Sequence, residues 1–151
     1  MKQVMKTMAL AMLIVLMVSM VMPAAAVTVP DVDRVGSITV AIRYQDKLVP
    51  GGSLTMYKVA DLKGTDGKYG YVLTADMAGS GVELGELKSE KLAQDLADYV
   101  KANNIQGKKQ QINDNGKVTF AGLSTGVYLF IQEERAEGYL AADPFLVSVP
   151  M

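Results

Sequence analysis

The chain has 151 residues, of which 21% are charged, and its formal net charge is −1. It contains no histidine and no cysteine, which excludes catalytic sites built on imidazole or thiolate, metal sites with those ligands, and disulfide bonds. Nucleic acids and anionic membranes bind basic surfaces, so this slightly acidic composition argues against both as partners.

Residues 1–26 have the pattern of a secretory signal peptide. Lys2 and Lys6 precede an apolar run over residues 8–22, and three alanines end at Ala26. We predict cleavage after Ala26; a retained membrane anchor is the alternative, because the run approaches spanning length. The exported part would hold 125 residues, enough for one domain with a core, with 13 basic and 16 acidic residues and a net charge of about −3.

The exported part begins with a lead over residues 27–35, which we expect to be a linker or a weakly held edge. A domain over residues 36–151 follows. Its first and last strands are indicated by alternating side chains, because successive residues of a strand point to opposite faces. The two apolar rows that define these strands are Ile38, Val40 and Ile42, and Phe145, Val147 and Val149.

About seven short strands are predicted, separated by turns rich in glycine, proline and asparagine. They cover residues 37–44, 53–59, 68–74, 108–112, 117–120, 127–131 and 145–149. The Asn115-Gly116 pair is a strong hairpin signal, and it lies between the fourth and fifth of these strands.

The pattern changes to a helical period in residues 86–103. Leu92, Leu96 and Val100 recur at four-residue steps, which predicts an amphipathic helix. The Ser89 hydroxyl is placed to cap its first turn. Many short strands with one inserted helix predict an all-β, Ig-like sandwich.

No cluster of polar residues predicts a catalytic or metal site. Glu133 and Glu134 are neighbours on a strand, so their side chains point to opposite faces and cannot share a substrate. Two acidic or amide-rich segments carry too few ligands for calcium, and we interpret them as turns: Asp31 and Asp33, and Asn113, Asp114 and Asn115.

Several tyrosines leave a sugar-binding surface open as an alternative. On strands, tyrosines are more often half-buried packing residues with a hydrated hydroxyl. The tyrosines that we considered are Tyr57, Tyr69, Tyr71, Tyr128 and Tyr139.

Three segments carry a resemblance to a known family: GSITVAIR, VPGGSLTMYKVADL, and GLSTGVYLFIQEERAEGY followed by PFLVSVPM. They resemble the prealbumin-like (Cna B-type) domains of Gram-positive surface proteins, in particular the N-terminal domain of sortase-assembled major pilins. The resemblance covers nearly all of residues 36–151. Its most specific parts are the strand that carries Tyr128, the Gly138-Tyr139 pair and the final strand.

In this family, the resemblance implies, many domains form an internal Lys–Asn isopeptide bond promoted by a buried acid. Alignment on the family pattern places Ile42 where the lysine would be and Gln132 where the acid would be, and the last strand has no asparagine. We therefore predict that Ile42 and Gln132 are non-reactive and that no isopeptide bond forms. We also expect Gln132 to be hydrogen-bonded, because a buried unpaired amide is costly.

The resemblance implies a structural, non-enzymatic module of a pilus backbone subunit or another wall-anchored protein, located on the cell surface. Its expected partners are other pilin or surface-protein subunits, with a host or matrix ligand as a further possibility; no cofactor is expected. An adhesin or carbohydrate-binding module is the alternative function, and an enzyme is the least favoured. The family's polymerisation motif and sorting signal are not found in this sequence, which stops at Met151. We expect the sequence to be a piece of a longer pilin; a short secreted relative is the alternative.

Overall fold

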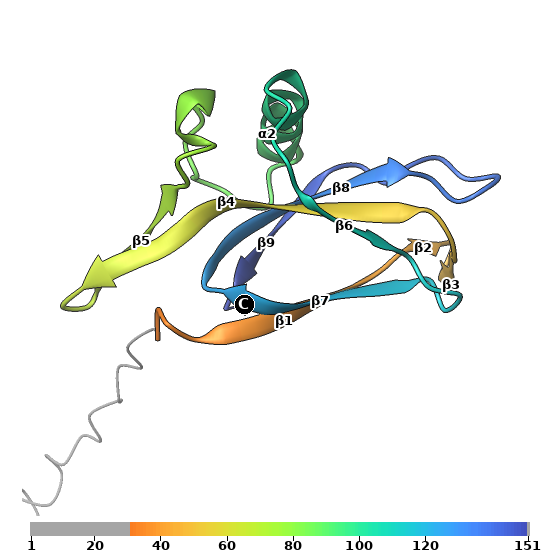
Figure 1. Ribbon diagram of the computed structural model, residues 1–151, viewed down its shortest axis with the longest axis horizontal. Helices are drawn as coiled ribbons and strands as arrows, with labels where there is room; N and C mark the ends of the chain where they lie inside the picture. The colour runs from red at the N-terminus through yellow and green to blue at the C-terminus, as the bar shows by residue number, and fades with distance from the viewer. Residues whose placement is uncertain (1–30, 151) are drawn as a thin grey trace, which may run out of the picture.

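The computed structural model describes residues 31–150 of the chain (Figure 1). The predicted signal peptide, the first four residues of the predicted lead and Met151 lie outside this range. Within it, no helix is both long enough and apolar enough to cross a membrane.

Residues 31–150 contain nine antiparallel strands, two of them only two residues long, together with one α-helix and a short 3-10 helix at Ala78–Ser80. The largest sheet has the order β5 (Lys68–Leu73), β4 (Ser53–Thr65), β8 (Gly126–Glu134), β9 (Phe145–Val149), and β6 (Lys108–Gln111) also pairs with β4. The second sheet joins β1 (Val35–Ala41) to β7 (Lys117–Ser124), and a third joins β2 (Arg43–Tyr44) to β3 (Lys47–Leu48). The predicted all-β sandwich is therefore confirmed.

The large sheet is covered on both faces. Figure 1 shows helix α2 (Glu90–Ala102) over one face and the β1–β7 sheet against the other. The core between the two sheets, the sandwich core, includes Ile38, Leu54, Val118, Phe120, Tyr128 and Phe130. The core between the sheet and α2, the helix core, includes Val59, Leu92, Leu96, Val100, Val127 and Leu129. Strand β8 supplies alternate residues to each core, because its side chains alternate between the two faces.

Both predicted apolar rows face the sandwich core. Ile38 and Val149 are buried, and the other four members of the rows are half-buried against the same cluster. Leu146, predicted to face the other way, packs against the helix core. The inward-facing rows of the first and last strands are therefore confirmed. The bounds of the first strand, predicted as residues 37–44, were wrong: β1 begins at Val35, inside the predicted lead, and ends at Ala41, and Arg43–Tyr44 form β2, which pairs with β3.

Helix α2 begins later than the sequence predicts, at Glu90 instead of residue 86. The Ser89 hydroxyl accepts a hydrogen bond from the Leu92 backbone N–H at 3.3 Å, which fixes Ser89 as the N-cap, as predicted. Residues 86–89 form a turn instead, closed by a bond from the Ser89 N–H to the Glu86 carbonyl. The predicted apolar face is confirmed, because its three residues are buried in the helix core.

Several other predictions about strands were wrong. Strand β7 runs to Ser124 and strand β8 to Glu134, beyond the predicted ends at residues 120 and 131. Strand β4 continues to Thr65, beyond the predicted end at residue 59, because its second half pairs with β5. The Asn115-Gly116 turn does form, with the Asn113 side chain accepting from the Lys117 N–H at 3.0 Å. It does not make a hairpin, since β6 pairs with β4 and β7 pairs with β1. Turn chemistry specifies where the chain reverses, and burial of the apolar side chains of β7 against β1 selects its partner.

Candidate functional site

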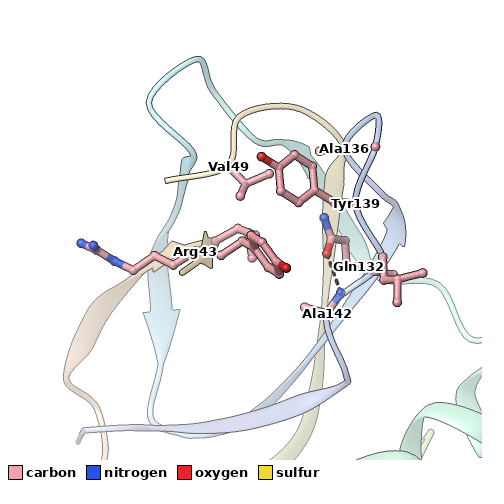
Figure 2. Close-up of a pocket in the computed structure, with 11 residues that line it drawn as sticks. Arg43, Val49, Gln132, Ala136, Tyr139 and Ala142 are labelled. Carbon is pink, nitrogen blue, oxygen red and sulfur yellow. Dashed lines mark hydrogen bonds between the residues drawn. The ribbon is translucent and has the colours of Figure 1, made fainter. Parts of the chain in front are cut away.

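A pocket of about 440 Å³ opens at the end of the sandwich where β1 stops. Its walls come from the turn-forming segment after β1, from the far end of β8 and from the connection between β8 and β9 (Figure 2). The residues that matter below are Ile42, Tyr44, Val49, Gln132, Ala136 and Tyr139.

Gln132 is the buried polar group of this pocket, with 7% of its surface exposed. It follows Tyr128 and Phe130 on the same face of β8, and the ladder between β8 and β9 ends at the Phe130–Phe145 pair. Beyond that pair the two chain segments separate, and the Gln132 Oε1 accepts a hydrogen bond from the Ala142 backbone N–H at 2.8 Å. The expectation that Gln132 is hydrogen-bonded is confirmed.

The same bond fixes which way the amide faces. Because a backbone N–H requires an acceptor, the oxygen of Gln132 lies toward Ala142 and the NH₂ group lies toward the pocket (Figure 2). Within residues 31–150, this NH₂ group has no hydrogen-bond partner on the protein. The pocket therefore contains a fixed and unused hydrogen-bond donor.

Two tyrosines form the aromatic part of the pocket. Tyr44 and Tyr139 pack edge to face, with ring centroids 5.7 Å apart and an interplanar angle of 71°. They remain 56% and 40% exposed, so their rings present apolar area to solvent. Gly138, at φ +82°, allows the turn in which the Tyr139 N–H donates to the Ala136 carbonyl.

The pocket is electrically neutral at its centre. Arg43 is its only charged lining residue, and Figure 2 shows its side chain directed away from the other labelled residues. Its guanidinium donates instead to the Asp46 carbonyl at 3.4 Å. These side chains can hold an apolar group on aromatic rings and pair one acceptor atom with the Gln132 amide.

The structure brings four of the five residues singled out from the sequence to this one pocket: Ile42, Gln132, Gly138 and Tyr139. Tyr128 lies elsewhere, buried in the sandwich core, and its hydroxyl donates to the Ser124 carbonyl at 2.7 Å. Sequence reasoning missed Tyr44 and Val49. Tyr44 was read as the end of a strand, and the positive φ angles of Gln45 and Asp46 turn the chain directly after it.

The remaining acidic candidates are separated as predicted. Glu133 accepts a hydrogen bond from the Tyr57 hydroxyl at 2.9 Å, whereas Glu134 pairs with Lys109. Burial, and secondarily the bond to Glu133, raise the pKa of Tyr57 to about 12. The bond from Lys109 lowers the pKa of the exposed Glu134 carboxyl.

The five tyrosines considered for sugar binding do not gather on one surface. Tyr57 and Tyr71 pack at the helix core, and Tyr128 lies in the sandwich core. Tyr69 lies on β5 opposite Gly64 of β4, and Tyr139 lies at the pocket. Asp31 and Asn113 each bond a backbone N–H two residues later, in agreement with the prediction of turns. Among residues 31–150, no three histidine, cysteine or acidic side chains are grouped to hold a metal ion.

No protein-family model matches the sequence, and no curated protein sequence does either. Among solved structures, the chain is similar to the full-length major pilin SpaD from Corynebacterium diphtheriae, with 22% identity and a TM-score of 0.44. The similarity covers 82% of this chain and 29% of the pilin chain, so the chain spans less than a third of that protein's length. The fold described above rests on the strands and their registers, independently of this similarity.

Proposed function

We propose that this chain is a structural, non-enzymatic module of the bacterial cell surface, a subunit domain of a pilus or a related wall-attached protein. The proposal rests first on the family resemblance over residues 36–151. The predicted signal peptide, which would export the chain, is compatible with it.

The observation that carries the proposal is the position of the strand on which the resemblance is most specific. Strand β8 is buried on both faces from Gly126 to Gln132 and lies between β4 and β9 in the large sheet. The motif residues of this strand therefore build the two cores, and Tyr128 ties the strand to the preceding turn through the Ser124 carbonyl. Residues that build cores suit a protein whose function is to hold its shape.

The absence of an internal isopeptide bond is part of the proposal. Ile42 and Gln132, the two positions aligned with the family's reactive pair, lie on one pocket without an amine or a carboxyl between them. Packing would then stabilise the domain in place of a covalent link.

Immunogold labelling of intact cells that express the full-length gene product tests this function. We expect label on the cell surface, and extracts of the wall fraction should contain the chain. Recovery of the chain only from the cytoplasm would contradict the proposal. Binding of the purified protein to a glycan array or to host matrix proteins would instead favour the adhesin alternative.

A further inference from the structure

The pocket at the end of β1 has two properties of a binding site that the structural role does not use. Its buried Gln132 holds an NH₂ group toward the cavity without a partner on residues 31–150. Its two tyrosines present exposed ring area beside that donor. An occupant must therefore supply a hydrogen-bond acceptor and an apolar surface.

Few polar groups and two aromatic rings fit an extended peptide better than a sugar. A sugar carries many hydroxyls, and each one that is buried without a partner lowers affinity. Aromatic grooves with one or two donors are a common way to bind extended segments that contain proline, because the rings contact the proline and a donor pairs with a backbone carbonyl.

The chain itself contains such a segment. Residues 27–30 read Val-Thr-Val-Pro, which are uncharged and mostly apolar. They directly precede the first described residues. Because they carry no charge, they suit a pocket whose centre is lined by uncharged side chains.

The segment joins the fold at the end opposite the pocket. Val32 is held there, because its carbonyl accepts a hydrogen bond from the Thr125 hydroxyl at 2.5 Å, and Gly36 lies against Val149. The pocket lies beyond the other end of β1, because Ile42, Arg43 and Tyr44, which follow that strand, line it. Figure 1 shows β2 and β3 at that end of β1. Strand β1 spans seven residues, about 20 Å. After cleavage following Ala26, the five residues before Val32 in the exported chain reach at most about 17 Å when extended. The segment therefore cannot fill the pocket of its own molecule.

We propose that the pocket receives residues 27–30 of a second copy of this chain. Because the donated segment and the pocket lie at opposite ends, the contact is head-to-tail and leaves a free pocket and a free segment at the two ends of each row. The inference deepens the proposed structural function, on which it rests, by assigning the surface through which subunits associate without a covalent bond.

Sedimentation velocity of the exported chain, beginning at Val27, tests this contact. We expect association that increases with protein concentration and is reversed by an excess of a synthetic peptide of residues 27–34. Tyr139→Ala removes an exposed ring and should weaken binding of the labelled peptide about tenfold or more. Val72→Ala, which truncates an exposed side chain far from the pocket, is the matched control and should bind as the unmodified chain does.

A mixing experiment separates this contact from other modes of association. Val29→Asp disables the segment and Tyr139→Ala disables the pocket, so each variant alone should remain a monomer. Mixed together, they should form heterodimers that grow no further, because only one intact segment and one intact pocket meet. A chain that stays monomeric without binding the peptide, or association that Tyr139→Ala leaves unchanged, would overturn the inference. Surface labelling of cells would still test the proposed function separately.

Discussion

Gln132 shows how one polar side chain shapes the end of this sandwich. Its neighbours on the same face of β8, Tyr128 and Phe130, belong to the sandwich core. A buried amide without partners would cost about 1–3 kcal/mol. The bond from the Ala142 N–H satisfies the oxygen of this amide, and the NH₂ group remains without a partner on residues 31–150. The connection between β8 and β9 is thereby held away from the ladder, which creates the pocket.

Gly126 is a backbone position that has no room for a side chain. It has φ +153°, and a Cβ there would lie 2.2 Å from the Ala60 carbonyl oxygen, on the neighbouring strand. We expect Gly126→Ala to lower the free energy of unfolding by about 2 kcal/mol or more, measured by urea denaturation. Gly70→Ala is the control, because nothing lies within 4 Å of its Cβ. Equal stability of the two variants would refute the steric argument.

Tyr57 gives the fold a specific dependence on alkaline pH. Burial, followed by the hydrogen bond to Glu133, raises its pKa from 10.0 to about 12. The unfolded chain therefore loses this proton at lower pH than the folded chain does, and the contribution to stability is complete below pH 10 and lost as the pH rises to 12.

The comparison with Tyr57→Phe isolates this effect. The variant loses the bond to Glu133 and should be less stable by about 1 kcal/mol below pH 10. The difference in unfolding free energy between the two proteins should shrink as the pH rises from 10 to 12, as measured by urea denaturation at several pH values. A difference that stays constant across this range would show that Tyr57 titrates normally.

At the scale of elements, strand β8 couples the two cores. Leu129 packs in the helix core and Phe130 packs in the sandwich core, so neither core can open without disturbing the strand that both share. Proteins of this size commonly unfold in one cooperative step.

Truncation in either core should therefore destabilise the whole domain. We expect Leu96→Ala, in the helix core, to cost about 2–5 kcal/mol and Phe120→Ala, in the sandwich core, about 3–5 kcal/mol. In both variants the helical far-UV signal and the aromatic near-UV signal should be lost at the same urea concentration. If Leu96→Ala melted α2 while the aromatic signal persisted, the two cores would be independent.

The sequence predicted those elements whose pattern arises from burial on one face. The alternation of Ile38 with its neighbours and the four-residue steps of Leu92 and Leu96 reflect a single apolar face, and both elements were found. Strand β8, by contrast, is apolar on both faces, and a continuous apolar run does not reveal that a helix covers the second face.

Partner choice was the part that sequence could not supply. The polar strand β6 carries no alternating apolar row, so nothing in its residues indicated pairing with β4 instead of β7. The pocket itself was not predicted. Gln132 and Tyr139 were singled out only by their places in the family pattern, and Tyr44 joins them through the turn at Gln45 and Asp46.

At the scale of the whole molecule, the first strand begins where the last strand ends, because Gly36 of β1 lies against Val149 of β9. Strand β1 reads VGSITVA and β9 reads FLVSV, so neither carries a lysine or an asparagine. An isopeptide bond would join a lysine amine to an asparagine carboxamide and release one ammonia. The first and last strands therefore contain neither the lysine nor the asparagine that an isopeptide bond between them would need.

We accordingly expect the intact mass of the folded, exported chain to equal the mass calculated from its sequence. The mass should be the same before and after denaturation, and a tryptic digest should yield linear peptides only. Loss of one ammonia from the folded protein, together with a branched peptide in the digest, would show that a cross-link forms elsewhere in the chain. Without such a link, resistance to separation of the two strands comes from the sandwich core, and Phe120→Ala should lower thermal stability and resistance to proteolysis together.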